Sequence, residues 1–208
     1  MRVNHSRSVL LGLALGFMLL WLPAFSSVQT GVGGLGDQGC TCHGGDSNEV
    51  TVVLSGLPVS FESNTTYNLS ITVESAVPEH ESSHQGGFRL IVNGEGIIAF
   101  ENATQAQYLE DGWTHEELGT YQRAWNLTWT SSPTSTEPVE FIVHGNTVNG
   151  NVLSSGDEWN SFGQAISHVD NPVQPEQPVF SRDIGVLDWS VFTLGLSALV
   201  FFFIRVIR

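Results

Sequence analysis

The sequence predicts an all-β domain folded as a two-sheet sandwich, with an apolar segment near each end of the chain. Its hydrophobic residues recur with a period of two and nowhere clearly with the period of 3.6 that marks a helix. Short apolar segments are separated by Gly, Ser, Asn and Pro over roughly 120 residues, a spacing typical of a sandwich. With 41% hydrophobic and only 13% charged residues among 208, the composition is not that of a disordered protein.

Several segments have the pattern of half-buried strands, because their apolar and polar residues alternate or form short β-rich runs. In chain order they are residues 50–54, 67–73, 88–92, 96–100, 125–129 and 139–143. We expect Asn93 and Gly94 to join the third and fourth segments in a hairpin, because both residues tolerate positive φ. The sandwich is predicted over residues 49–168. The glycine-rich residues 28–48 have too few apolar side chains for a core and should wrap it as a loop.

The first 27 residues have the layout of a secretory signal peptide. Arg2 and Arg7 precede an apolar run at residues 9–25, and Ala24 and Ser26 occupy the −3 and −1 positions of a cleavage site. An uncleaved N-terminal anchor is the alternative, but the apolar run is near the short end for a membrane span. The sequence therefore predicts export and cleavage.

A second apolar run, residues 189–204, predicts a transmembrane helix over residues 187–205. Sixteen residues rise about 24 Å, and the span lengthens if Arg205 snorkels to the interface. The positive-inside rule then places Arg205 and the tail 206–208 in the cytoplasm and the ectodomain outside the cell. A buried core helix is the alternative, which four phenylalanines without a polar face disfavour.

The part of the chain expected outside the cell is strongly acidic. The whole chain has 21 acidic and 7 basic residues, a net charge of −14, and no lysine. Residues 28–183 hold 20 of the acidic residues and three arginines, which gives 3 − 20 = −17. Phosphate recognition needs clustered Lys and Arg, so nucleic acid is excluded as a partner. Residues 169–186 contain three prolines and predict a semi-extended stalk.

Both cysteines of the chain lie in one short segment, Gly-Cys-Thr-Cys-His-Gly at residues 39–44. Cys40, Cys42 and His43 permit three interpretations, which the sequence leaves open. They attach a c-type haem, with His43 as the proximal ligand and His144 or His168 as the distal one, although the spacer is one residue shorter than in Cys-x-x-Cys-His. They bind copper or zinc with a distal His or carboxylate. Or the two cysteines form a small, strained disulfide.

The sequence has no Ser/His/Asp elbow, no phosphate loop and no closely paired carboxylates in apolar surroundings, so it predicts no enzymatic activity. Four Asn-x-Ser/Thr sequons predict N-glycosylation at Asn64, Asn68, Asn102 and Asn126.

Together these landmarks resemble the choice-of-anchor V domain family, extracellular proteins of bacteria and archaea related to the reeler-type domains of animal secreted proteins. The resemblance runs from about residue 31 to 162. It rests on the Cys-Thr-Cys-His-Gly-Gly segment, Gly87-Phe88-Arg89-Leu90, the strands at 66–73 and 125–130, and the block from Phe141 to Asp157. It implies an immunoglobulin-like β-sandwich, exported and fastened to the envelope. Members usually carry Cys-x-x-Cys-His for haem attachment, from which Cys40 and Cys42 depart by one residue.

The predicted function is therefore that of a membrane-anchored cell-surface protein with a single-pass anchor. It is a non-enzymatic binding or envelope module with a Cys/His redox or metal site, and its partner is the membrane together with an unknown extracellular ligand or protein. The alternative is a membrane-tethered electron carrier with one c-type haem. The cofactor is accordingly haem c, copper or zinc, or none.

Overall fold

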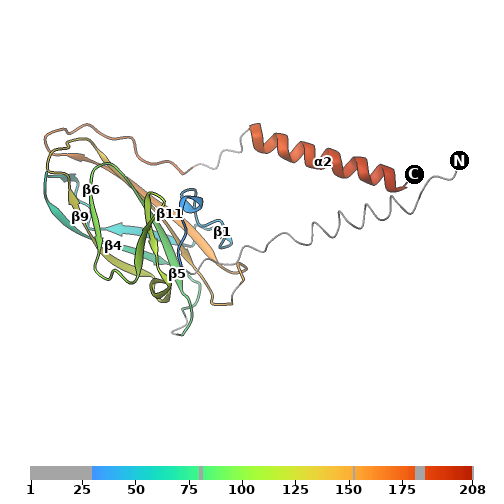
Figure 1. The fold of residues 1–208 in the computed structure, drawn as a ribbon, viewed down its shortest axis with the longest axis horizontal. Helices are drawn as coiled ribbons and strands as arrows, with labels where there is room; N and C mark the ends of the chain where they lie inside the picture. Colours follow the sequence, from blue (N-terminus) through green and yellow to red (C-terminus); the bar gives the residue numbers. More distant parts are fainter. Residues whose placement is uncertain (1–29, 80–81, 152, 181–185, 208) are drawn as a thin grey trace. The chain divides into compact units, whose positions relative to one another are not determined.

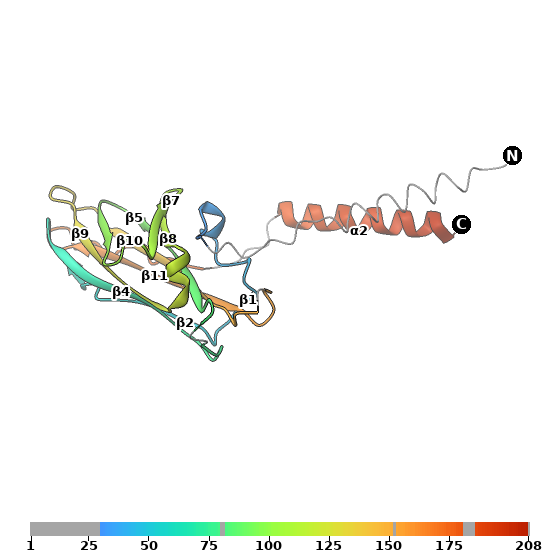
Figure 2. The same ribbon diagram turned by 60° about the horizontal axis from the view of Figure 1, so that its bottom comes forward.

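The computed structural model describes residues 30–79, 82–151, 153–180 and 186–207 (Figure 1). The chain divides into two compact units, Met1–Pro178 and Val179–Arg208. Within the first unit the strands form two sheets packed face to face (Figures 1 and 2), so the predicted β-sandwich is confirmed. The predicted signal peptide at residues 1–27 lies outside the described residues.

The smaller sheet has four antiparallel strands, and the sequence pattern predicted all of them. Their order is β2-β4-β9-β6. The strands are β2 (Thr51–Ser55), β4 (Thr66–Glu74), β9 (Ala124–Ser131) and β6 (Gly96–Phe100). Alternate residues of β9 are buried, namely Trp125, Leu127 and Trp129, because successive side chains of a strand point to opposite faces of its sheet.

The larger sheet has seven strands, with β10 and β5 in the middle of its main path. The order is β1-β11-β10-β5-β8-β7, and β3 pairs with β11 off this path. The strands are β1 (Gly45–Asp46), β3 (Ser60–Phe61), β5 (Gly86–Asn93), β7 (Ala106–Leu109), β8 (Gly112–His115), β10 (Val139–Thr147) and β11 (Glu158–His168). Two short 3-10 helices, η1 (Gly34–Gly36) and η2 (Glu117–Tyr121), lie in the connections. The parallel pairings of β1 and β3 with β11 bring the N-terminal part of the domain against its last strand.

Aromatic side chains from both sheets fill the core. Trp129 of β9 meets Phe141 of β10 edge to face, with ring centroids 5.1 Å apart. Trp125 lies 4.9 Å from Phe88 of β5. All four rings are essentially buried. Edge and tilted contacts of this kind add about 0.5–1.5 kcal/mol each to the free energy of burial.

The predicted hairpin at Asn93-Gly94 is wrong. The strands on its two sides belong to different sheets, since β5 pairs with β10 and β8 whereas β6 pairs with β9. Gly94 does take positive φ, at 140°, as the dipeptide predicts. However, the Asn93 side chain donates to Glu140 of β10, and the rings of Phe88 and Phe100 stack across the core at 5.4 Å. Both strands bury apolar side chains between the sheets, so the turn crosses from one sheet to the other.

The proline-containing segment after β11 is extended, but it lies along the sandwich instead of standing free of it. Gln177 exchanges hydrogen bonds with the backbone of Ala165, and Ser167 donates to the carbonyl of Val173. Asn171 donates to the carbonyl of Thr136. Residues 171–177 of the predicted stalk at 169–186 are therefore bonded to the sandwich.

The C-terminal apolar run forms the helix α2 (Val186–Ile207). Over the described parts of the chain, we find no helix with the length and apolar character needed to cross a membrane. The prediction of a transmembrane helix at residues 187–205 is therefore not supported.

Candidate functional site

The loop that carries the cysteines is held on the larger sheet by Arg89 of β5, whose side chain is fully buried. The Arg89 Nε donates to Oδ1 of Asp37 at 2.8 Å. Its Nη1 and Nη2 donate to the carbonyls of Leu109 and Glu110 at 2.6 and 2.7 Å, and Nη1 also reaches the Val32 carbonyl at 3.3 Å. A buried guanidinium is stable only when its donors are satisfied, and here the partners come from the loop and from the β7–β8 turn. Arg89 thus joins these two segments.

His144 of β10 makes a second attachment to the same loop. Its Nε2 lies 3.0 Å from the Asp37 carbonyl oxygen, and its Nδ1 lies 2.6 Å from Oγ of Ser161 on the neighbouring strand. Burial lowers the pKa of His144, partly opposed by the Asp37 carbonyl and carboxylate. Nε2 therefore donates to Asp37, and the imidazole serves as a neutral structural group.

Two glycines flank the cysteine segment, and the geometry requires both. Gly39 has φ of 113°, and a Cβ there would lie 2.3 Å from ring carbons of Trp159. Gly44 has φ of 68°, and a Cβ there would lie 2.0 Å from the Asp157 carbonyl oxygen. The chain thus enters the segment against the indole of Trp159 and leaves it against the backbone of Asp157. Only glycine combines positive φ with such close approach.

The two cysteines have different environments. Cys40 is 8% exposed, whereas Cys42 is exposed, and both are free thiols. Burial, with a smaller contribution from Cys42, raises the pKa of the Cys40 thiol from the ordinary 9.0 to about 12. The His43 amide donates to the Cys40 carbonyl at 2.9 Å, and this bond closes a turn that contains both cysteines. The thiolate is the reactive and metal-binding form of cysteine, and burial disfavours it in Cys40. The exposed Cys42 is therefore the sulfur of the pair that a reagent or a metal ion can reach.

His43 is oriented by a carboxylate that the sequence analysis did not assign a role. Its Nδ1 lies 3.2 Å from Oδ2 of Asp157, and the two side chains are 18% and 5% exposed. Oδ1 of the same carboxylate accepts from the amide of Asn149 at 3.1 Å. A carboxylate that holds one ring nitrogen fixes the tautomer of the other. In His43, Nε2 is thus the nitrogen left to meet a ligand.

The predicted metal ligands are not brought together. His168 ends β11, where its Nε2 lies 2.9 Å from Oγ of Ser63 and its Nδ1 accepts from the amide of Asp170 at 3.0 Å. Seven residues of strand separate it from Ser161, the partner of His144, which is a distance of about 23 Å. In residues 30–79, 82–151, 153–180 and 186–207, no three His, Cys, Asp or Glu side chains form a group that could hold a metal ion. Cys42 and His43 alone offer at most an open, incomplete site.

These residues do not fit a c-type haem. Two thioether links require both thiols to reach the vinyl groups, but Cys40 is buried. A distal ligand requires a free imidazole nitrogen, but both ring nitrogens of His144 and of His168 are hydrogen-bonded. We therefore assign no electron-transfer step to haem.

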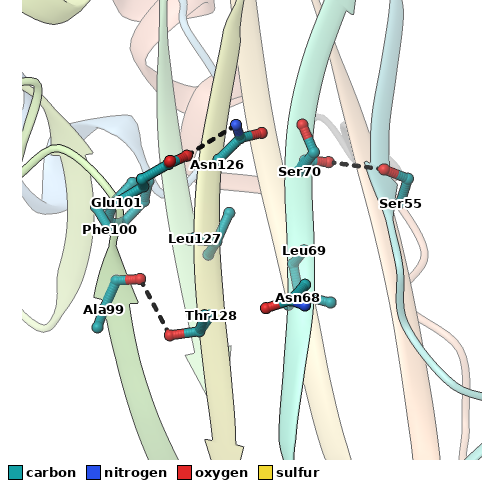
Figure 3. Close-up of a pocket in the computed structure, with 10 residues that line it drawn as sticks. All are labelled: Ser55, Asn68, Leu69, Ser70, Ala99, Phe100, Glu101, Asn126, Leu127 and Thr128. Atoms are coloured by element: carbon teal, nitrogen blue, oxygen red, sulfur yellow. Dashed lines mark hydrogen bonds between the residues drawn. The ribbon is translucent and has the colours of Figure 1, made fainter.

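A second candidate surface is a groove on the outer face of the four-stranded sheet (Figure 3). Its volume is about 580 Å³. Residues of β2, β4, β6 and β9 and the adjoining Glu101 line it: Ser55, Asn68, Leu69, Ser70, Ala99, Phe100, Glu101, Asn126, Leu127 and Thr128. Several of its polar groups already bond to one another, as Asn126 does to Glu101 at 3.0 Å. The groove contains two of the four sequon asparagines.

Substitution of Gly39 by alanine is expected to displace the cysteine segment from Trp159. The new Cβ meets the indole at a distance that real contacts never show, and an L-residue is strained at this φ. We expect the Cys40 thiol of this variant to react with a maleimide at least about tenfold faster than in the native protein, because local opening exposes it. Gly45→Ala is the matched control, since its Cβ has no neighbour within 4 Å. Equal rates in the two variants would show that Gly39 does not seat Cys40.

Comparisons with known proteins assign no family. No protein-family model matches the chain, and no curated protein matches it. Among solved structures, it is similar to the reeler domain of human F-spondin, with 17% identity over 60% of this chain and 91% of that one and a TM-score of 0.39. It is also similar to a conjugative transposon lipoprotein from Bacteroides eggerthii (19% identity, 56% and 97% covered, TM-score 0.36). A lipoprotein from Bacteroides thetaiotaomicron is a third (12% identity, 59% and 82% covered, TM-score 0.39). Likeness at this level carries no argument about function, and the choice-of-anchor V resemblance stays a prediction.

Proposed function

We propose that this chain is an exported, non-enzymatic β-sandwich module of the cell envelope whose binding site is the segment with Cys42 and His43. The leader pattern of residues 1–27 supports export. The ligand is a soft or borderline cation such as Cu⁺ or Zn²⁺, because a thiolate and an imidazole are the donors that such ions prefer. A partner or water supplies the remaining ligands.

One observation carries this proposal: the segment is fixed to the sandwich on both sides, yet it leaves one sulfur accessible. Arg89 and His144 hold Asp37 before the cysteines, and Asp157 holds His43 after them. Cys42 lies between these attachments and is exposed. A loop that only covered the sheet would not need such fixed ends. Fixed ends favour binding, because a residue already held by a rigid scaffold loses less conformational entropy when the ligand binds.

Labelling of intact cells tests the export and the accessible thiol together. The full chain is expressed in a host that processes its leader, and the cells are treated with a membrane-impermeant maleimide. We expect Cys42 to be labelled and Cys40 to stay protected until the protein is denatured. Cys42→Ser should remove the labelling, while Cys40→Ser should retain it. Labelling that requires cell lysis would overturn the export.

A competition experiment tests the cation. Purified full chain is incubated with Zn²⁺ or with Cu⁺ before the maleimide is added. The proposal predicts that the metal slows labelling of Cys42, and that His43→Ala weakens this protection. Asp157→Asn should weaken it less, because it changes the orientation of His43 without removing the ligand. Labelling at the same rate with and without either metal would overturn the cation site.

A further inference from the structure

We propose that Asn102, in the turn between β6 and β7, is the N-glycosylation site of the folded chain, and that the other three sequons are not acceptors once the sandwich has formed. The inference rests on the proposed export, since only an exported chain meets a glycan donor of this kind. The sequence alone does not distinguish the four sequons. The structure separates them by what holds the asparagine and by what holds the hydroxyl two residues later.

The chemistry sets the requirement. Transfer forms a bond from Nδ2 of the asparagine to the anomeric carbon of a sugar, breaks the bond from that carbon to the phosphate of a lipid-linked donor, and releases one Nδ2 proton. The enzyme recognises the asparagine together with the Ser or Thr hydroxyl at the second following position. The acceptor segment therefore has to be exposed, and its amide nitrogen and hydroxyl cannot be committed to a strand ladder.

Asn102 meets this requirement. Asn102, Ala103 and Thr104 are all exposed and lie outside the strands. Oδ1 of Asn102 accepts from both the amide and the hydroxyl of Thr104, at 3.1 and 2.7 Å. The Gln105 amide donates to the Asn102 carbonyl at 3.1 Å and closes the turn. The carboxamide and the recognised hydroxyl are thus already adjacent, and the bonds between them use the oxygen, not the nitrogen that is glycosylated.

The sequons at Asn68 and Asn126 face each other in the middle of the smaller sheet. In the β4–β9 register Asn68 lies opposite Thr128 and Asn126 lies opposite Ser70, so each asparagine is paired with the other sequon's hydroxyl residue. Figure 3 shows that Nδ2 of Asn126 donates to Glu101, at 3.0 Å, and that the Thr128 hydroxyl points to the Ala99 carbonyl, at 3.4 Å. Both acceptor segments are thus held straight in a ladder.

In the sequon at Asn64, the hydroxyl that the enzyme recognises is already held in the sheet. Asn64 itself lies in a turn, but its amide donates to the Ser132 carbonyl at 3.2 Å. Thr66, which carries the recognised hydroxyl, is the first residue of β4, and its Oγ1 lies 2.8 Å from Oγ1 of Thr130 on β9. An enzyme that engaged this hydroxyl would have to open the end of the β4–β9 pair.

Glycosylation of the purified protein tests the inference without relying on export. Folded, unmodified full chain is incubated with an oligosaccharyltransferase and a lipid-linked oligosaccharide, and occupancy is read by peptide mass spectrometry. We expect occupancy at Asn102 to exceed that of each other sequon by roughly tenfold or more. Thr104→Ala should abolish it and Thr104→Ser should retain it. In chain kept unfolded, the preference for Asn102 should disappear.

Two results would overturn the inference: equal or greater occupancy at Asn64, Asn68 or Asn126 in the folded chain, or no occupancy at Asn102 while the unfolded chain is modified. Labelling of Cys42 on intact cells reports the export separately. A chain that is labelled from outside but carries no glycan at Asn102 in a glycosylating host would refute this site and leave the export standing.

Discussion

Replacement of Arg89 by methionine is expected to lower the free energy of unfolding by about 3–5 kcal/mol. The substitution keeps a long side chain in a fully buried position but removes the guanidinium that donates to the Asp37 carboxylate and to the carbonyls of Leu109 and Glu110. Hydrogen bonds to a charged group contribute about 1.5–3 kcal/mol each, and the substitution loses several of them. The loop and the β7–β8 turn lose their common attachment, so we also expect faster hydrogen exchange in both segments. Urea denaturation measures the loss of stability.

Two further substitutions separate charge from hydrogen-bond geometry. Arg89→Lys keeps the positive charge but cannot reach several acceptors at once, so it should recover only a small part of the loss. Asp37→Asn keeps most of the donors satisfied, and Asp37 is partly exposed, so the expected loss is about 1 kcal/mol. Native stability in the methionine variant would show that the loop is not attached through Arg89.

Alkaline pH is expected to destabilise the fold through Cys40. In the folded protein burial raises the pKa of this thiol to about 12, whereas in the unfolded chain it ionises near 9. The folded state therefore retains a proton that the unfolded state releases. Its contribution is fully present below pH 9 and is lost as pH rises toward 12, at up to about 1.4 kcal/mol per pH unit.

Matched cysteine variants isolate this contribution from that of other groups that titrate at high pH. We expect the pH dependence of the unfolding free energy between pH 9 and 11 to be shallower in Cys40→Ala than in the native chain. Cys42→Ala should retain most of the native slope, because burial, the larger cause of the raised Cys40 pKa, stays in place. A native slope in the Cys40 variant would mean that this thiol is not buried in solution.

The pattern of alternating residues predicted the core strands of the smaller sheet but not the partners of every strand. Trp125, Leu127 and Trp129 alternate, and β9 buries all three. The Asn93-Gly94 signal is local and reports only that the chain turns. Which sheet each flanking strand joins depends on contacts with β10 and β9, which lie far away in the sequence.

The last strand, β11, was missed because its burial does not alternate. Its first seven residues are all half-buried, and only the last four are buried. An alternating sequence pattern identifies a strand only when one face of the strand lies in the core and the other in water. In β11 the first seven residues are half-buried on both faces, so this strand does not show that contrast.

The sequence pointed to the cysteine segment of the candidate site but not to the residues that hold this segment in place. Cys40, Cys42 and His43 stood out by spacing, whereas Asp157 is distant in sequence and reaches His43 only through the fold. Arg89 did give a signal that could have been used. A lone arginine inside an apolar strand must find acceptors when it is buried, and Asp37 is an acidic residue in the glycine-rich loop. The sequence alone cannot pair these two residues.

The central claim is that the cysteine segment is part of the folded sandwich and presents Cys42 alone. Maleimide labelling of the purified full chain at pH 8, with each thiol resolved by mass spectrometry, tests it most directly. We predict that Cys40 reacts much more slowly than the exposed Cys42, and roughly a thousandfold more slowly than it does in the unfolded chain, because burial raises the pKa of its thiol from 9.0 to about 12. Its rate should rise with urea in parallel with unfolding. Equal rates for both thiols without denaturant would contradict the account.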